Sequence, residues 1–146
     1  MAHPFKIDRI LLATDLSPAG EPAVLYATAL AGRFDAELYV LHVVPTPAGP
    51  CRASEAWEQE ATAAMRQLRQ HLLALHDKYA QTAVLSGEPA ARILQKADDV
   101  HADLIVMGTS AHGPRPGGLT DTVLRGAPCP VVAVPLAQEE RAELHP

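Results

Sequence analysis

Short apolar runs alternate with longer amphipathic stretches along most of this chain. Five of the runs are brief, rich in Val, Ile, Leu and Ala, and stopped by Gly, Pro or Asp. They span residues 7–14, 37–44, 82–86, 104–107 and 131–134. Runs of this kind are typical of strands that are buried on both faces of a parallel sheet. The pattern therefore predicts five strands.

The stretch after the first run predicts a helix. Its apolar positions recur at helical spacing and are Ala23, Tyr26, Ala27 and Leu30. Ser17 can cap the start of this helix, Pro18 fits its first position, and Gly32 is the expected stop.

The longest amphipathic stretch follows a connection rich in Pro and Gly, residues 45–53, which we expect to be disordered. Its apolar residues recur at steps of three and four and are Trp57, Ala61, Ala64, Leu68, Leu72, Leu75 and Tyr79. Such a stripe predicts one long helix with a single face on the sheet. His71 and His76 are five residues apart, so they do not share a helix face as a metal-binding pair would. We expect both to face solvent.

Two shorter helices complete the alternation. One opens at residues 87–89, and its buried side consists of Ile93, Leu94, Ala97 and Val100. The other spans residues 119–125, where Leu119 and Val123 are predicted to share the buried face. Gly126 suits the left-handed position that often follows a helix end.

Strict alternation of five strands and four helices predicts an α/β fold, a doubly wound five-stranded parallel sheet sandwiched by the helices. A chain of 146 residues is the size of one domain, so we expect residues 1–146 to form a single unit. Ligands of such sheets bind beyond the carboxyl ends of the strands, where the winding reverses. The residues expected there end the first and fourth strands and are Ala13, Thr14, Asp15, Met107 and Gly108.

A glycine-rich loop leads from the fourth strand to the last helix. Where it meets the helix, backbone N–H groups form a concavity that favours an anion such as phosphate. These groups belong to Gly117, Gly118, Leu119 and Thr120. The alternative is that the glycines and prolines only turn the chain, because loose glycine-rich matches are common.

Composition and charge exclude several classes of partner. A net charge of -5 with scattered Lys and Arg provides no basic surface for nucleic acid or for an anionic membrane. No segment has the pattern of a secretion signal or a membrane span, so we expect a soluble, cytoplasmic protein. Cys51 and Cys129 match neither a redox motif nor a zinc cluster, and we expect reduced thiols and no bound metal.

Several motifs, taken together, resemble the universal stress protein family over nearly the whole chain. They are ILLATDLSP, LHVVP, SGEPAARIL, ADLIVMGT and VLRGAPCPVVAVP. The resemblance implies a fold of the adenine-nucleotide α-hydrolase type and, in one branch of the family, ATP or another adenine nucleotide as the ligand. It also implies that Asp15 bonds a ribose or adenine group and that the backbone of Val43 meets adenine. The alternative for Asp15 is a residue that only orders the turn before the first helix.

The phosphate loop departs from the pattern of the ATP-binding branch, which is G-x2-G-x9-G-[ST]. Gly108 matches the first glycine and Gly117 the third, but Ala111 replaces the second and the spacing is four residues short. Gly118 stands where Ser or Thr is expected. Thr120 supplies a hydroxyl two residues later, which on a short helix can also bond locally. The start DLSP and the acidic ending also resemble the branch that lacks the phosphate loop.

These features leave two functions open and disfavour others. The first is a regulatory stress-response protein whose degenerate adenine-nucleotide site binds ATP or AMP weakly, and the second is a nucleotide-free dimeric interaction module. An ATP-consuming enzyme is disfavoured because the loop supplies only Arg115 and Arg125 as cations. A receiver domain is disfavoured because it requires a lysine after the fifth strand, where this chain has Pro135 and Leu136.

The last strand predicts how the protein assembles. The run Val131–Val134 would lie at a sheet edge, where an apolar strand invites pairing with a second copy. We therefore expect a homodimer. We also expect that the protein is not an enzyme and that it acts on a further regulatory protein partner.

Overall fold

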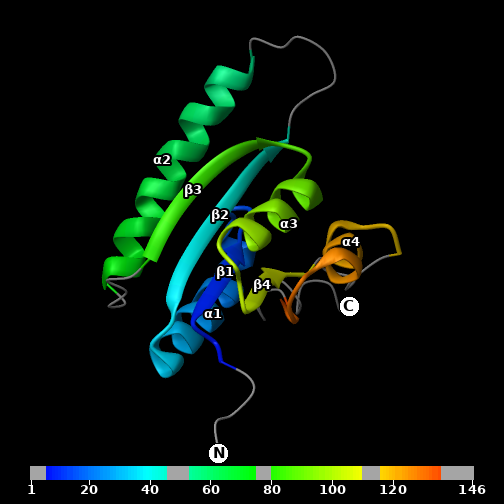
Figure 1. The fold of residues 1–146 in the computed structure, drawn as a ribbon. Coiled ribbons are helices and arrows are strands. Elements are labelled where there is room, and N and C mark those ends of the chain that lie inside the picture. The colour runs from blue at the N-terminus through cyan, green and yellow to red at the C-terminus, as the bar shows by residue number, and fades with distance from the viewer. Residues whose placement is uncertain (1–5, 46–52, 75–79, 110–115, 136–146) are drawn as a thin grey trace, which may run out of the picture.

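The computed structural model describes residues 6–45, 53–74, 80–109 and 116–135 (Figure 1). Its strands are β1 (Arg9–Ala13), β2 (Glu37–Pro45), β3 (Ala80–Gly87), β4 (Leu104–Gly108) and β5 (Val131–Val134). Its helices are α1 (Glu21–Phe34), α2 (Ala53–Ala74), α3 (Pro89–Asp99) and α4 (Leu119–Gly126), and a short 3-10 turn, η1 (Pro18–Gly20), precedes α1. The predicted alternation of strands and helices is confirmed.

Neighbouring strands all run parallel, in the order β3-β2-β1-β4-β5. The central strand, β1, is buried from Ile10 to Ala13 because helices cover both faces of the sheet. The chain winds toward β3 on one side of β1 and toward β5 on the other. The carboxyl ends of β1 and β4 therefore flank the point where the winding reverses, as predicted.

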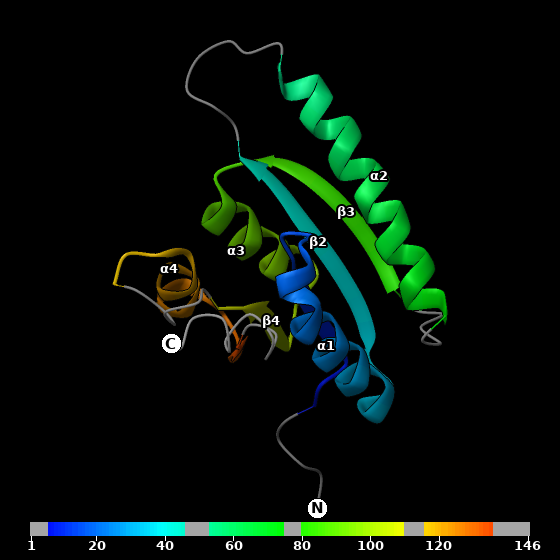
Figure 2. The same cartoon turned by 180° about the vertical axis from the view of Figure 1, so that it is seen from behind.

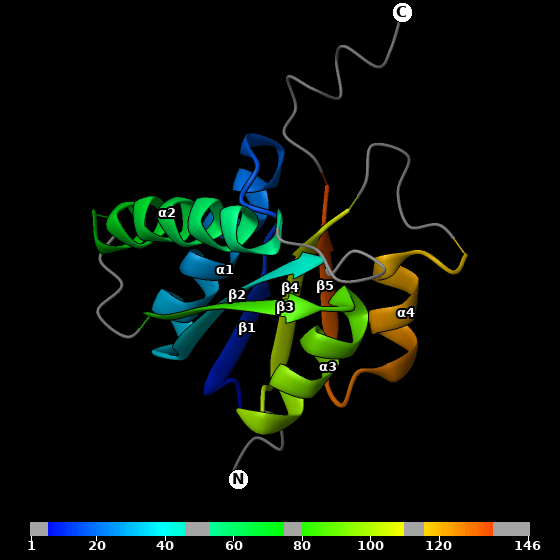
Figure 3. The ribbon, with the colours of Figure 1, turned by 90° about the horizontal axis from the view of Figure 1, so that it is seen from above.

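Two apolar cores lie on opposite faces of the sheet. Figure 3 shows α1 and α2 on one face and α3 and α4 on the other, and Figure 2 views the molecule from the α1 side. Because side chains alternate along a strand, Ile10 and Leu12 of β1 join the core under α1 and α2, whereas Leu11 and Ala13 join the core under α3 and α4. The doubly wound sandwich is confirmed.

The first helix begins and ends later than the sequence predicts. Ser17 precedes η1, but its hydroxyl donates to Asp15 Oδ1 at 2.6 Å instead of capping a helix. Gly32 does not stop α1, which continues to Phe34. The helix ends at Asp35, whose φ of 52° is left-handed. Aspartate adopts this conformation more readily than most residues, so the glycine is not needed there.

The long helix α2 packs on the sheet through a wider stripe than predicted. Ala61, Met65 and Leu72 are buried, and Ala64 and Leu68 are half-buried. Met65 follows Ala61 by one turn and was missing from the predicted stripe. Within the described ranges no helix is long and apolar enough to cross a bilayer. Some parts of the sequence prediction lie outside what the structure describes. These are residues 46–52, the side chains of Trp57 and His71, and Leu75, His76 and Tyr79.

Gly126 has a different role from the one predicted. It lies inside α4, and the residue that caps this helix, Ala127, is extended. A Cβ at position 126 would stand 2.8 Å from Leu94 Cδ1 of α3. The glycine therefore permits the close approach of α3 and α4 on their side of the sheet.

Removing the Leu72 side chain should destabilise the fold strongly. Leu72 belongs to α2 and is fully buried. Truncating a buried leucine costs about 2–5 kcal/mol because a cavity remains. Leu72→Ala should lower the free energy of unfolding by that amount in urea titrations. The control is Arg69→Ala on the exposed side of the same helix, which should change little. Equal losses for the two variants would mean that α2 faces the sheet differently.

Candidate functional site

The turn after β1 is held by its own side chains. Thr14 Oγ1 accepts from the N–H of Leu16 at 3.0 Å, and Leu16 adopts a left-handed φ of 64°. Asp15 Oδ1 accepts from the N–H of Ser17 at 2.9 Å and from its hydroxyl. Asp15 therefore orders this turn, which is one of the two roles that the sequence left open. Both bonds use Oδ1, and the carboxylate is exposed at the carboxyl end of the sheet.

The ladder between β1 and β2 stops at this turn. Its last rung runs from the N–H of Thr14 to the carbonyl of Leu41, at 3.0 Å. In a parallel ladder the next rung would run from the N–H of Val43 to the carbonyl of Thr14. That carbonyl instead meets His42 Nδ1 at 2.8 Å. Because alternate residues of a strand direct their backbone groups to the same side, the N–H and C=O of Val43 point past the end of β1.

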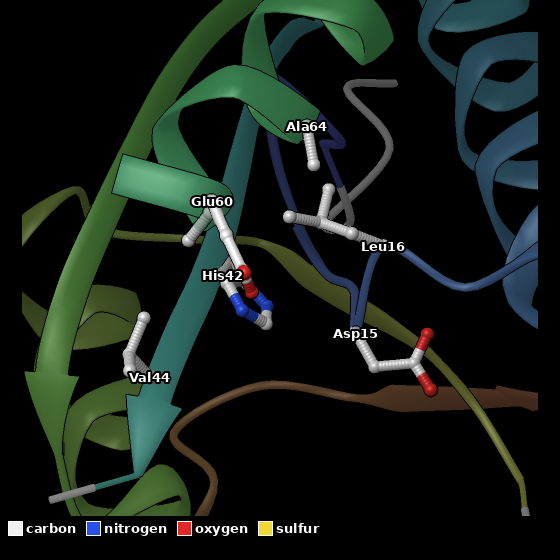
Figure 4. Close-up of a pocket in the computed structure, with 7 residues that line it drawn as sticks. Asp15, Leu16, His42, Val44, Glu60 and Ala64 are labelled. Carbon is white, nitrogen blue, oxygen red and sulfur yellow. The ribbon is translucent and has the colours of Figure 1, made fainter. Parts of the chain in front are cut away.

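An open cleft of about 370 Å³ lies beside these strand ends (Figure 4). Its lining comes from the β1 turn, from β2 and from α2, and consists of Asp15, Leu16, His42, Val44, Glu60, Ala61 and Ala64. The volume is in the range that holds a small molecule. The charged side chains of this lining are the carboxylates of Asp15 and Glu60, so the cleft favours hydrogen-bond donors over anions.

The second part of the candidate site lies at the ends of β4 and α4. Met107 is buried and Gly108 half-buried in β4, and the N–H of Thr109 donates to the carbonyl of Val134 at 2.8 Å. This bond ties the end of β4 to β5. Gly117 has a left-handed φ of 78°, and no atom of the described residues beyond its chain neighbours lies within 4 Å of a Cβ built there. Backbone conformation, and not crowding, therefore favours glycine at position 117.

The start of α4 is bonded within itself. The N–H of Gly117 donates to Asp121 Oδ2 at 2.9 Å, and the Thr122 hydroxyl donates to the carbonyl of Gly118 at 2.9 Å. Arg125 Nε reaches the same Asp121 carboxylate at 3.1 Å. One of the N–H groups expected to face an anion therefore already has a carboxylate partner.

The buried face of α4 differs from the predicted one. Leu119 is 44% exposed, whereas Thr120 is only 7% exposed and Val123 is fully buried. The helix is rotated so that Thr120, and not Leu119, packs inward with Val123. Thr120, whose hydroxyl comes two residues after Gly118, is therefore buried on the inward face of α4.

The predicted site residues fall into two groups. Ala13, Thr14, Asp15 and Val43 meet at the ends of β1 and β2, and Met107 and Gly108 lie next to them because β4 pairs with β1. The four residues Gly117, Gly118, Leu119 and Thr120 lie at the start of α4. The loop between β4 and α4, with Ala111 and the shortened spacing, lies outside the described residues.

The cleft residues on β2 and α2 were not predicted as site residues. The cleft residues with polar side chains on these elements are His42 and Glu60. One signal was available, since strand alternation places His42 and Val44 on the face opposite Val43. Nothing in the sequence indicates which turn of α2 would meet that face.

Cys129, the cysteine that the structure describes, does not line the cleft. Cys129 is half-buried, and burial, with a smaller effect of the Asp103 carboxylate, raises the pKa of its thiol. Cys51 lies outside the described residues. In the part of the chain that the structure describes, no group of three or more His, Cys, Asp or Glu side chains could hold a metal ion.

Asp121 should make stability depend on pH. The N–H of Gly117, and then Arg125, lower the pKa of this carboxyl below its ordinary 3.8. A lowered folded-state pKa means that the carboxylate stabilises the fold above pH 3.8, and that this contribution is lost as pH falls through the folded-state value. Asp121→Asn should therefore lower the melting temperature slightly at pH 7, and the difference from the parent should vanish in acid.

The matched control is Asp99→Asn, at an exposed position on α3. Melting curves of both variants across the acid range decide the matter. A deficit of Asp121→Asn that persists unchanged below the titration range would show that charge at this helix start is irrelevant.

Comparisons with known proteins agree with this architecture. Residues 6–135 match the universal stress protein family. Universal stress protein MJ0531 of Methanocaldococcus jannaschii is 31% identical over 144 residues, which cover 90% of this chain and 84% of that protein. A universal stress protein of Thermus aquaticus is 37% identical over 133 residues, covering 86% of this chain and 96% of that protein.

Solved structures extend the likeness to the fold. The structure of universal stress protein UspA from Lactobacillus plantarum has a TM-score of 0.76 at 30% identity, covering 88% of this chain and 98% of that one. A universal stress protein in complex with cAMP has a TM-score of 0.73 at 20% identity, over 90% and 99% of the chains. One from Archaeoglobus fulgidus in complex with dAMP has a TM-score of 0.66 at 22% identity, over 89% and 98%. The chain belongs to the universal stress protein family.

Proposed function

We propose that this chain is a regulatory, non-enzymatic universal stress protein whose cleft binds the nucleoside part of an adenine nucleotide weakly. The observation that carries the proposal is the backbone of Val43, whose N–H and C=O point past the end of β1 beside the cleft. The complexes of two structural neighbours with cAMP and dAMP support an adenine nucleotide as the ligand class.

The Val43 backbone matches one edge of adenine. A strand residue offers a donor and an acceptor on the same side, and adenine offers the complementary ring nitrogen acceptor and exocyclic amino donor. Hypoxanthine, the base of inosine, has a protonated ring nitrogen and a carbonyl oxygen in the same places. Hypoxanthine would therefore place a donor against the Val43 N–H and an acceptor against the Val43 carbonyl, so the strand edge should select adenine.

The cleft favours the sugar over the phosphates. Asp15 holds its turn through Oδ1 alone, which leaves Oδ2 to accept a bond from a ribose hydroxyl. Asp15 and Glu60 are the charged side chains of the lining, and both repel a phosphate. Phosphate groups would therefore extend away from this lining, toward the start of α4.

The start of α4 is a poor phosphate site. Gly118 has no hydroxyl, and a hydrogen bond to a charged group contributes roughly 1.5–3 kcal/mol, about ten- to a hundredfold in affinity. The N–H of Gly117 and the side chain of Arg125 are both engaged by Asp121. ATP should therefore gain little over AMP. Phosphoryl transfer, which requires concentrated positive charge, is not supported for the same reason.

The edge strand β5 supports a second proposal, a homodimer. β5 is the last strand of the sheet, and Val131, Val132 and Ala133 are only half-buried in one copy. An apolar edge of this kind is stabilised by pairing with its copy. The nucleotide-free alternative, a dimeric interaction module for a regulatory protein, would use the same surface.

Titration calorimetry tests the nucleotide proposal. Adenosine, AMP and ATP should bind with similar, weak affinities, and inosine should bind at least tenfold more weakly, because one mismatched pair costs about 1–3 kcal/mol. Asp15→Asn keeps an acceptor for Ser17 but loses the charge, so adenosine binding should fall. Val43→Ala is the control, since only its backbone meets the ligand, and it should change affinity little.

Two outcomes would contradict this proposal. Tight ATP binding that discriminates strongly against AMP would show that the shortened loop forms a working phosphate site. No heat from any adenine compound at millimolar concentration would instead favour the interaction module, and Asp15→Asn would then have no effect on function.

Light scattering tests the dimer. The parent protein should have the mass of two copies at micromolar concentration, and Val132→Lys should give a monomer because a charge is placed in the paired edge. The control is Thr62→Lys, at an exposed position of α2, and this variant should stay dimeric. A monomeric parent, or a Val132→Lys variant that remains a dimer, would show that β5 is not the interface.

A further inference from the structure

His42 occupies an unusual place in the hydrogen-bond network of the cleft. Its ring comes from β2, lines the cleft together with Asp15 and Glu60, and is only half-buried (Figure 4). Its Nδ1 lies 2.8 Å from the carbonyl oxygen of Thr14, the first residue after β1. A carbonyl oxygen only accepts hydrogen bonds, so Nδ1 must carry a proton and donate it there. In the neutral ring, Nε2 is then an acceptor.

This bond replaces a rung of the sheet. The β1–β2 register pairs Ala13 with Leu41, and the last rung joins the N–H of Thr14 to the carbonyl of Leu41. The following rung would join the N–H of Val43 to the carbonyl of Thr14. Among the described backbone groups that rung is not made, and the carbonyl that would accept it is bonded by the His42 side chain of the same strand.

We infer that His42 is a positioning residue that ends the β1–β2 ladder one rung early and thereby leaves the Val43 N–H free for a ligand. The inference rests on the proposed function, because the ligand meant is the adenine base. The imidazole satisfies the Thr14 carbonyl, which would otherwise draw the Val43 N–H toward β1 and close the strand edge. Adenine specificity would then depend on a side chain that need not touch the base.

The geometry also explains why a donor at the δ position is needed. The ring must turn back from position 42 to reach a carbonyl on the neighbouring strand, and Nδ1 is the ring nitrogen closer to the backbone. An asparagine places its amide nitrogen at about the same point, whereas a glutamine places it near Nε2. Phenylalanine keeps the ring and removes both nitrogens. Substituting asparagine, glutamine or phenylalanine for His42 therefore distinguishes the effect of a donor at the δ position from that of a donor at the ε position and from that of the ring volume.

The experiment combines amide hydrogen exchange with calorimetry on the full chain. In the parent without ligand, the Val43 amide should exchange fast for a strand residue, and adenosine should slow it. In His42→Phe, the Val43 N–H should bond the Thr14 carbonyl, so its exchange should slow at least tenfold without ligand while adenosine affinity falls at least tenfold. His42→Asn should resemble the parent in both measurements, and His42→Gln should resemble His42→Phe.

The outcomes separate this inference from the proposed function. If the parent binds adenosine and His42→Phe binds it equally well, the inference is wrong and the proposed function stands. If the parent binds no adenine compound, the proposed function fails, and the exchange rate of Val43 in the parent and in His42→Phe still decides whether His42 holds the edge open. Should His42→Phe not fold, the contrast between His42→Asn and His42→Gln decides, and equal behaviour of these two would overturn the inference.

Discussion

The structure depends on where the parallel ladder between β1 and β2 stops. Two central strands of a covered sheet normally pair until one of them leaves, because an unpaired backbone group inside the fold is costly. Here β1 leaves at Thr14, and a side chain, His42, takes over the last carbonyl at 2.8 Å. The Thr14–Ser17 turn, the cleft against α2 and the Val43 backbone, which has no described partner on β1, all lie at this early end.

The two halves of the site differ in how well they are prepared for a ligand. At the proposed nucleoside end, Asp15 lines a cleft of about 370 Å³ and bonds its own turn through Oδ1. At the proposed phosphate end, Asp121 already occupies the N–H of Gly117 and the side chain of Arg125. A ligand phosphate would have to compete with a carboxylate that is part of the same helix turn. This asymmetry is the physical reason for proposing a ligand recognised by its base and sugar.

The sequence predicted the fold well because the fold is governed by patterns of burial. Short apolar runs and helical stripes determine which faces must be covered, and they placed the strands and the shorter helices to within a few residues. The predicted end of the long helix, at Tyr79, lies outside the described residues. The errors came from local geometry. Gly32 and Gly126 both looked like helix ends, yet Asp35 ends α1 and Gly126 makes room for Leu94. Leu119 seemed the inward residue of α4, but Thr120 packs there, since one short helix fixes its rotation only through contacts with α3 and the sheet.

The site was predicted in outline only, because strand ends follow from topology but hydrogen-bond partners do not. The role of His42 depends on a carbonyl 28 residues away, which no local pattern reveals. An NMR titration of backbone amides with adenosine and then with ATP shows which end of the site holds the ligand. Recognition through the base and the sugar predicts that the Val43 amide shifts with both ligands, while the amides of Gly118 and Leu119 shift little more with ATP than with adenosine. Large ATP-specific shifts at Gly118 and Leu119, with none at Val43, would contradict it.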